Sequence, residues 1–150
     1  MAGPGTRPTA VLFACGMNAV RSPMAAAITR HLFANRIYVR SAGVRQGERD
    51  PFVDAVMAEI GMDTSAHQPK TFEDLDESGF DLIITLAPEA HHRALELTRT
   101  EAVEVEYWPT IDPTVATGSR EQILNAYRQV RDQLMARIKK RLAWTPSPSG

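Results

Sequence analysis

The part of the sequence best equipped for chemistry is a loop that contains its single cysteine. Cys15-Gly16-Met17-Asn18-Ala19-Val20-Arg21-Ser22 follows an apolar run and precedes a segment with helical periodicity. A loop in that position turns successive backbone N–H groups inward, and the helix N-terminus adds partial positive charge. Such a loop binds a tetrahedral dianion. The candidate phosphate-binding residues are Gly16, Met17, Asn18, Ala19, Val20, Arg21 and Ser22.

Four side chains of this loop suit catalysis on a bound phosphate. The planar guanidinium of Arg21 can bind two phosphate oxygens at once. The positive field of the loop favours the thiolate form of Cys15, which is its nucleophilic form. Ser22 can donate a hydrogen bond to that thiolate. Asn18 tolerates left-handed backbone angles and can pin the loop through its amide.

Each of these residues also has a purely structural interpretation. A cysteine after a buried strand is often a small core residue, and an arginine at a helix start is usually solvated. The combination is rarer, because a cysteine, five intervening residues, an arginine and a serine meet at one strand–helix junction. We therefore predict a catalytic loop with Cys15 as the nucleophile and Arg21 as the anion-binding cation.

The elements around the loop follow from apolar runs and helical periodicity. The sequence predicts strands over residues 10–14, 37–39, 82–86 and 103–107, and helices over 22–35, 51–61, 88–97 and 119–142. Ser41-Ala42-Gly43 is expected to close the second strand, and the strand 103–107 to be half-exposed or at an edge. Alternating strands and helices predict an α/β domain with an open, parallel, four-stranded sheet and helices on both faces. Ligands of such sheets bind beyond the carboxyl ends of the strands, where Cys15 falls.

Composition narrows the class of protein. The 150 residues suit one domain, predicted over 10–144, with flexible tails at 1–9 and 145–150. A net charge of -1 argues against nucleic acid as a partner, and no apolar run approaches the ~20 residues of a membrane span. One cysteine excludes an internal disulfide and favours a reducing, cytoplasmic setting. We expect a monomer or a weak dimer.

The loop and its flanks resemble the low-molecular-weight protein tyrosine phosphatase family. The match includes residues 11–15, Asn18 and residues 21–25, then Ser41-Ala42-Gly43 and residues 81–84. Asp112-Pro113 stands before the last helix, where that family keeps its general acid. The resemblance implies the phosphotyrosine protein phosphatase I-like fold and covers nearly all of the chain between the tails.

The resemblance also implies a mechanism. Cys15, Arg21 and Asp112 would be the catalytic residues, with Asp112 protonating the leaving oxygen of a phosphate monoester and a phospho-cysteine as intermediate. Without the resemblance, Asp112 would be a turn aspartate before proline. The substrate would be a phosphorylated protein, with phosphotyrosine foremost, or a small phosphate ester. No metal or organic cofactor is implied.

Departures from the family pattern keep two alternatives open. Met17 stands where glycine is usual, Val20 where many members have a second cysteine, and Thr114 where aromatic residues line a phosphotyrosine pocket. Arsenate reductases share the fold, and residues 108–113 resemble theirs; with a single cysteine, a reductase would need an external low-molecular-weight thiol. Pro23, where reductases usually have glutamine, favours the phosphatase. The second alternative is a non-catalytic phosphate-binding module.

Overall fold

A four-stranded parallel sheet organises the molecule. The computed structural model describes residues 8–34, 36–75 and 78–143. All three strand pairs are parallel, and the strand order is β2-β1-β3-β4, which leaves the last strand at an edge as predicted. The strands are β1 (Ala10–Cys15), β2 (Tyr38–Gly43), β3 (Leu82–Thr85) and β4 (Glu104–Tyr107).

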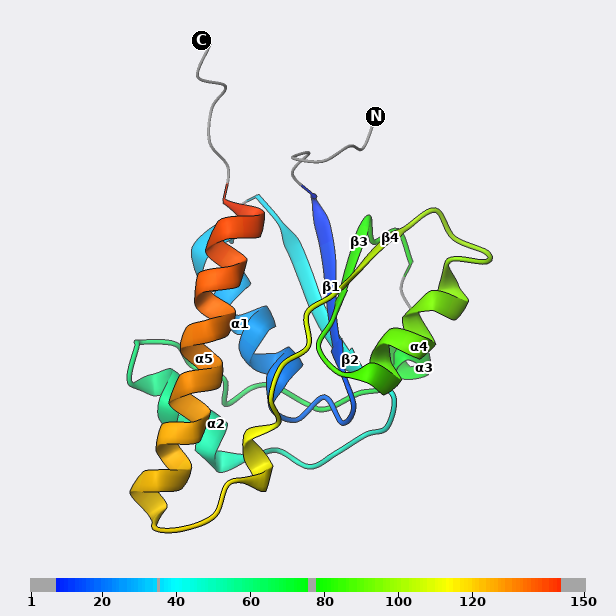
Figure 1. The fold of residues 1–150 in the computed structure, drawn as a ribbon. Helices are drawn as coiled ribbons and strands as arrows, with labels where there is room; N and C mark the ends of the chain where they lie inside the picture. Colours follow the sequence, from blue (N-terminus) through cyan, green and yellow to red (C-terminus); the bar gives the residue numbers. More distant parts are fainter. Residues whose placement is uncertain (1–7, 35, 76–77, 144–150) are drawn as a thin grey trace, which may run out of the picture.

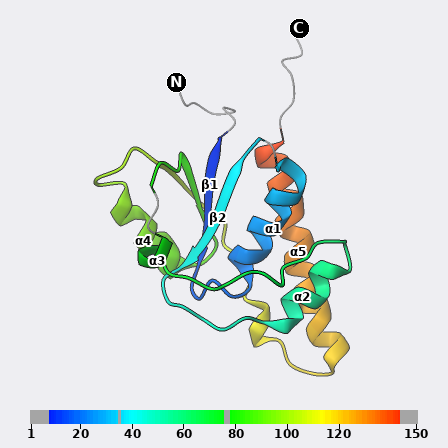
Figure 2. The same ribbon diagram turned by 180° about the vertical axis from the view of Figure 1, so that it is seen from behind.

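Helices cover both faces of this sheet, which confirms the predicted architecture. Figures 1 and 2 show α1, α2 and α5 on one face and α3 and α4 on the other. Their bounds are α1 (Arg21–Phe33), α2 (Pro51–Ala58), α3 (Phe72–Leu75), α4 (Pro88–Leu97) and α5 (Arg120–Leu142). No helix among the described residues is long and apolar enough to cross a bilayer.

The apolar run of β1 is continuous because both of its faces are buried. Val11 and Phe13 belong to the larger core beneath α1 and α5, whereas Leu12 belongs to the smaller core beneath α3 and α4. β1 therefore lies at the centre of the molecule. Its last residue, Cys15, lies at the carboxyl end of the parallel strands, where the loop begins.

Two predicted boundaries were wrong for identifiable reasons. Ser41-Ala42-Gly43 continues β2 and does not close it, because its residues pair in register with the end of β1, Gly43 with Cys15. α2 ends at Ala58, and the chain then turns to Gly61, whose φ of 78° only glycine adopts easily. A hydrogen bond of 3.0 Å from Met62 N to Met57 O closes this turn.

The remaining differences are small. β3 stops one residue before Leu86, β4 begins one residue after Val103, and α1 begins at Arg21 instead of Ser22. The short α3 and a 3-10 helix at Pro113–Val115 were not predicted. The predicted helix end at Asn35, the tail predictions for 1–7 and 145–150, and the domain boundary at Trp144 lie outside the described residues.

Candidate active site

The phosphate loop, Cys15–Ser22, is held from one side by the chain that follows β2. Three successive loop carbonyls accept hydrogen bonds from that chain: Cys15 O from Val44 N at 3.2 Å, Gly16 O from Arg45 N at 2.9 Å, and Met17 O from Gly47 N at 2.9 Å. A trans peptide places the next N–H opposite its carbonyl. The N–H groups of Gly16, Met17 and Asn18 therefore point away from this supporting chain.

These N–H groups lie beside the start of α1. Within the described part of the chain, no acceptor takes the N–H groups of residues 17–20. Val20, at the N-cap of α1, offers no side-chain cap, and the first turn of the helix contains no acid. Unpaired N–H groups beside a helix N-terminus attract a negatively charged oxygen.

Asn18 fixes the shape of the loop. It is fully buried and adopts a left-handed φ of 54°. Its Nδ2 donates to Ser22 Oγ at 2.9 Å, and its Oδ1 accepts from Lys70 N at 2.9 Å. Its carbonyl accepts from His67 Nε2 at 2.8 Å. The pinning role expected of Asn18 is present, but the sequence did not indicate that His67 and Lys70 are its partners.

Cys15 and Ser22 are in direct contact at the floor of the loop. Cys15 Sγ lies 2.9 Å from Ser22 Oγ, and both residues are almost completely buried. Because Ser22 Oγ already accepts from Asn18 Nδ2, its own hydroxyl proton remains available for the sulfur. The arrangement can therefore stabilise a Cys15 thiolate.

Arg21 and Asp112 are far apart in the sequence but lie close together in the structure. Arg21 Nη1 donates to Thr110 O at 2.9 Å, and Arg21 Nη2 lies 3.9 Å from Asp112 Oδ2. Asp112 Oδ1 accepts from Thr114 N and Oγ1, at 3.0 and 2.7 Å, and so caps the 3-10 helix. Asp112 thus forms the turn that an aspartate before proline predicts, while its other oxygen faces Arg21.

A buried tyrosine of α5 is hydrogen-bonded to the N-cap residue of α2. Tyr127 OH donates to Asp50 Oδ2 at 2.6 Å, and Asp50 caps α2 through Phe52 N. Burial, then the hydrogen bond to Asp50, and then the negative charges of Asp50 and Asp112 raise the pKa of Tyr127 above its ordinary value. Tyr127 therefore stays protonated and keeps donating to Asp50 at neutral pH.

Three aliphatic side chains are exposed near the site, and the exposed ion pair of Arg45 with Glu89 also lies against Gly16 of the loop. Met17, Ile111 and Val115 are 42%, 69% and 73% exposed. Trp108 is buried in the core, where its ring packs edge-to-face with that of Phe13. Among residues 8–34, 36–75 and 78–143, no three His, Cys, Asp or Glu side chains are grouped to hold a metal ion.

Comparisons with known proteins agree with this geometry. The family described as "Low molecular weight phosphotyrosine protein phosphatase" matches residues 10–144. An arsenate reductase of Shouchella clausii is 31% identical over 130 residues, which cover 87% of this chain and 92% of that protein. A solved arsenate reductase "in the phosphate binding state" has a TM-score of 0.71 and 27% identity, over 90% of this chain and 97% of its own. The arginine phosphatase YwlE from Geobacillus stearothermophilus has a TM-score of 0.72 and 25% identity, over 91% of each chain.

Proposed function

The chain belongs to the low molecular weight phosphotyrosine protein phosphatase family, and from that premise we propose that Cys15 attacks a tetrahedral oxyanion. The loop N–H groups and Arg21 hold the oxyanion, and the sulfur displaces one of its oxygens. The contact between Cys15 Sγ and Ser22 Oγ, 2.9 Å long beneath an uncapped helix N-terminus, carries this proposal. A serine hydroxyl and a positive helix end both favour a thiolate nucleophile.

The first candidate reaction is hydrolysis of a phosphate monoester. Cys15 sulfur bonds to phosphorus while the ester P–O bond breaks, and Asp112 gives its proton to the leaving oxygen. Water then attacks the phospho-cysteine and returns a proton to Asp112, which releases inorganic phosphate and the Cys15 thiolate. The contact of 3.9 Å between Asp112 Oδ2 and Arg21 Nη2 supports this assignment of the acid.

The aliphatic surroundings bear on the ester that would be hydrolysed. Met17 lies in the loop, and Ile111 and Val115 flank Asp112, so exposed apolar surface adjoins the proposed acid. These three side chains favour an apolar leaving group over a charged one. None of the three carries an aromatic ring to stack on a phenol, and we therefore include small apolar esters beside phosphotyrosine.

The second candidate reaction is the reduction of arsenate. Two of the three similar proteins described above are arsenate reductases, so the comparisons favour this reaction over hydrolysis. Cys15 would displace water from arsenate to form a sulfur–arsenic(V) adduct. A thiol would then attack Cys15 sulfur, releasing arsenite and leaving a mixed disulfide, and a second thiol would restore Cys15. Because the sequence has no second cysteine, both thiols must come from outside the chain.

One pair of assays separates the two reactions. The purified protein is tested for p-nitrophenyl phosphate hydrolysis across pH, and for arsenite production from arsenate with a low-molecular-weight thiol present or absent. Cys15→Ser, which keeps the size of the side chain, is the control in both assays and should abolish either activity. Activity that persists in Cys15→Ser would contradict the nucleophile. If the protein binds phosphate but is inactive in both assays, it would be a non-catalytic phosphate-binding module.

A further inference from the structure

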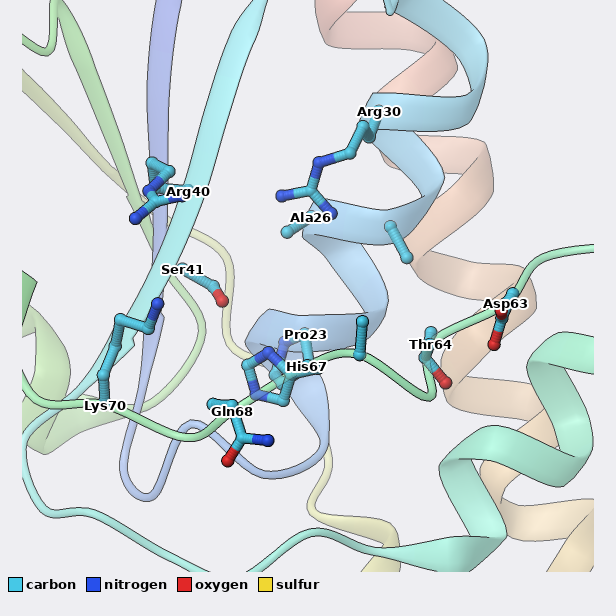
Figure 3. Close-up of a pocket in the computed structure, with 12 residues that line it drawn as sticks. Pro23, Ala26, Arg30, Arg40, Ser41, Asp63, Thr64, His67, Gln68 and Lys70 are labelled. Atoms are coloured by element: carbon cyan, nitrogen blue, oxygen red, sulfur yellow. The ribbon is translucent and has the colours of Figure 1, made fainter.

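Two segments that are far apart in the sequence support the phosphate loop. Residues 44–47 donate three hydrogen bonds to its carbonyls. Residues 67–70 hold Asn18 through His67 Nε2 and Lys70 N, and Figure 3 shows both side chains on this second segment. Neither segment lies in a helix or a strand, so their positions depend on contacts with other parts of the chain.

The two segments are joined to each other at both ends. Gly43, just before the first segment, donates from its N–H to Lys70 O at 2.9 Å. Arg49, which follows the first segment, reaches the turn at residues 64–67 that leads into the second. The two supports therefore form one unit, and Arg49 supplies a side-chain link within it.

The guanidinium of Arg49 lies where three carbonyls of this turn converge. Its Nη1 donates to Thr64 O at 3.1 Å, to Ser65 O at 2.7 Å and to His67 O at 2.9 Å. Its Nη2 donates to Asp54 Oδ2 on α2, and Thr64 Oγ1 donates to Asp54 Oδ1. Arg49, Asp54 and the turn thus form a closed network of hydrogen bonds.

An arginine is the side chain best suited to this position. Carbonyl oxygens that are buried without a donor destabilise a turn, because they have lost their hydrogen bonds to water. Thr64 is buried and His67 is half-buried, so the turn depends on the donor that Arg49 provides. The rigid guanidinium serves the carbonyls with one nitrogen and the carboxylate with the other, which a lysine ammonium cannot do in the same geometry.

The turn held by Arg49 ends at the residue that contacts the loop. His67 accepts from Arg49 through its carbonyl and donates through Nε2 to Asn18 O at 2.8 Å. A displaced turn would therefore move the imidazole away from Asn18. The Asn18 carbonyl and the Ala19 N–H belong to one peptide plane and point in opposite directions. Holding the carbonyl thus fixes the direction of the Ala19 N–H, which no acceptor takes within the described residues.

We propose that Arg49 is a positioning residue of the phosphate loop. It fixes the turn at residues 64–67 and so holds His67 against Asn18 O. The Ala19 N–H then stays directed at the bound oxyanion. Arg49 acts through His67 and not by touching the oxyanion. The inference rests on the oxyanion site proposed for the loop, and it does not depend on which of the two reactions follows.

A double-mutant cycle on phosphate binding tests this proposal. The Kd of inorganic phosphate is measured by titration calorimetry for the wild type, Arg49→Met, His67→Ala and the double variant. Arg49→Met should raise the Kd by roughly threefold to tenfold, the equivalent of about one net hydrogen bond. Combined with His67→Ala, the same change should raise the Kd by less than about twofold, because the link to the loop is already lost.

Arg131→Met is the matched control for stability. Arg131 also binds a carbonyl and a carboxylate, since it donates to Val56 O at 2.7 Å and to Glu59 Oε1 at 2.9 Å, but it joins α2 to α5. Its loss should lower the free energy of unfolding and leave the Kd of phosphate unchanged. The amide resonance of Ala19 should shift in Arg49→Met and stay in place in Arg131→Met. If Arg49→Met does not fold, Arg49→Lys carries the same cycle with a smaller expected change, since an ammonium replaces only part of the guanidinium fork.

Two results would overturn the proposal. The first is a phosphate Kd that Arg49→Met leaves unchanged, or that Arg131→Met raises as much as Arg49→Met does. The second is a pair of effects, from Arg49→Met and His67→Ala, that simply multiply in the double variant. Failure of the wild type to bind phosphate would instead refute the oxyanion site itself, and the positioning role of Arg49 with it.

Discussion

The phosphate loop and the segment that carries Asp112, residues 109–116, are built in opposite ways. Asn18 and Ser22 in the loop are fully buried, whereas Ile111 and Val115 in the acid segment are 69% and 73% exposed. The loop is held from behind by hydrogen bonds from residues 44–47 and 67–70. The acid segment is anchored by Thr110, which donates to Leu86 O and accepts from Arg21.

In the proposed mechanism, this difference means that the nucleophile is fixed in advance and the acid can adjust its position. Buried and fully hydrogen-bonded side chains fix the loop before any ligand arrives, which removes the cost of organising it during the reaction. Arg21 contacts both regions, because it starts α1 and donates to Thr110 O. An oxyanion in the loop would compete with Thr110 for this guanidinium, so binding of the oxyanion and the position of Asp112 are coupled.

Among substitutions that leave Cys15 in place, the largest effect is expected from Asp112→Asn. The asparagine keeps an oxygen for Thr114 N, so the turn should persist and stability should change by less than about 0.5 kcal/mol. Turnover of alkyl phosphates, which have poor leaving groups, should fall by about 10²–10⁴-fold because no acid protonates them. Turnover of p-nitrophenyl phosphate should fall much less. Steady-state kinetics on both substrates provide the check, and an equal loss on both would make Asp112 structural.

Asn18 is expected to give an intermediate effect that involves stability as well as activity. Asn18→Ala removes two side-chain hydrogen bonds and leaves a left-handed alanine, which together should cost about 2–4 kcal/mol of unfolding free energy. Turnover should fall by about 10–100-fold as the loop loses its geometry.

Asn18→Gly is the matched control for the backbone. It loses the same hydrogen bonds but tolerates a φ of 54°, so it should be more stable than Asn18→Ala by about 1 kcal/mol. Urea denaturation of both variants measures this difference. Equal stabilities would show that the left-handed backbone of the loop carries no cost.

The smallest effect is a pH dependence of stability from His67. Burial, together with the positive charges of Lys70, Arg49 and Arg30, lowers the pKa of His67 below its ordinary value of 6.5. Below that pH the unfolded chain binds a proton that the folded chain resists, so stability should fall as the pH drops from 7.5 toward 5. His67→Gln should flatten this acid-side slope, since glutamine does not titrate. His31→Gln, at an exposed histidine, is the control and should leave the slope unchanged. An unchanged slope in His67→Gln would contradict the lowered pKa of His67 as its cause.

Local patterns predicted the loop, and distant contacts could not be predicted. The nucleophile, the arginine and Asn18 lie within seven residues, so their types and spacing carry the signal. His67 and Lys70 reach Asn18 from 49 and 52 residues away, and nothing in their own surroundings in the sequence marks them. Asp112 was identified through the family resemblance, because an aspartate before proline is by itself an ordinary turn residue. The four residues of α3 are too few to show helical periodicity.

Trapping the intermediate tests whether Cys15 forms a covalent bond to the oxyanion. Asp112→Asn is mixed with p-nitrophenyl phosphate and quenched in acid, and the intact protein and its peptides are weighed by mass spectrometry. Because this variant lacks the base that activates water, we predict one added phosphoryl group, located on Cys15. The group should be absent when Cys15 is replaced by serine. Nitrophenol released without any phosphoryl group on the protein, or a phosphoryl group on another residue, would contradict it.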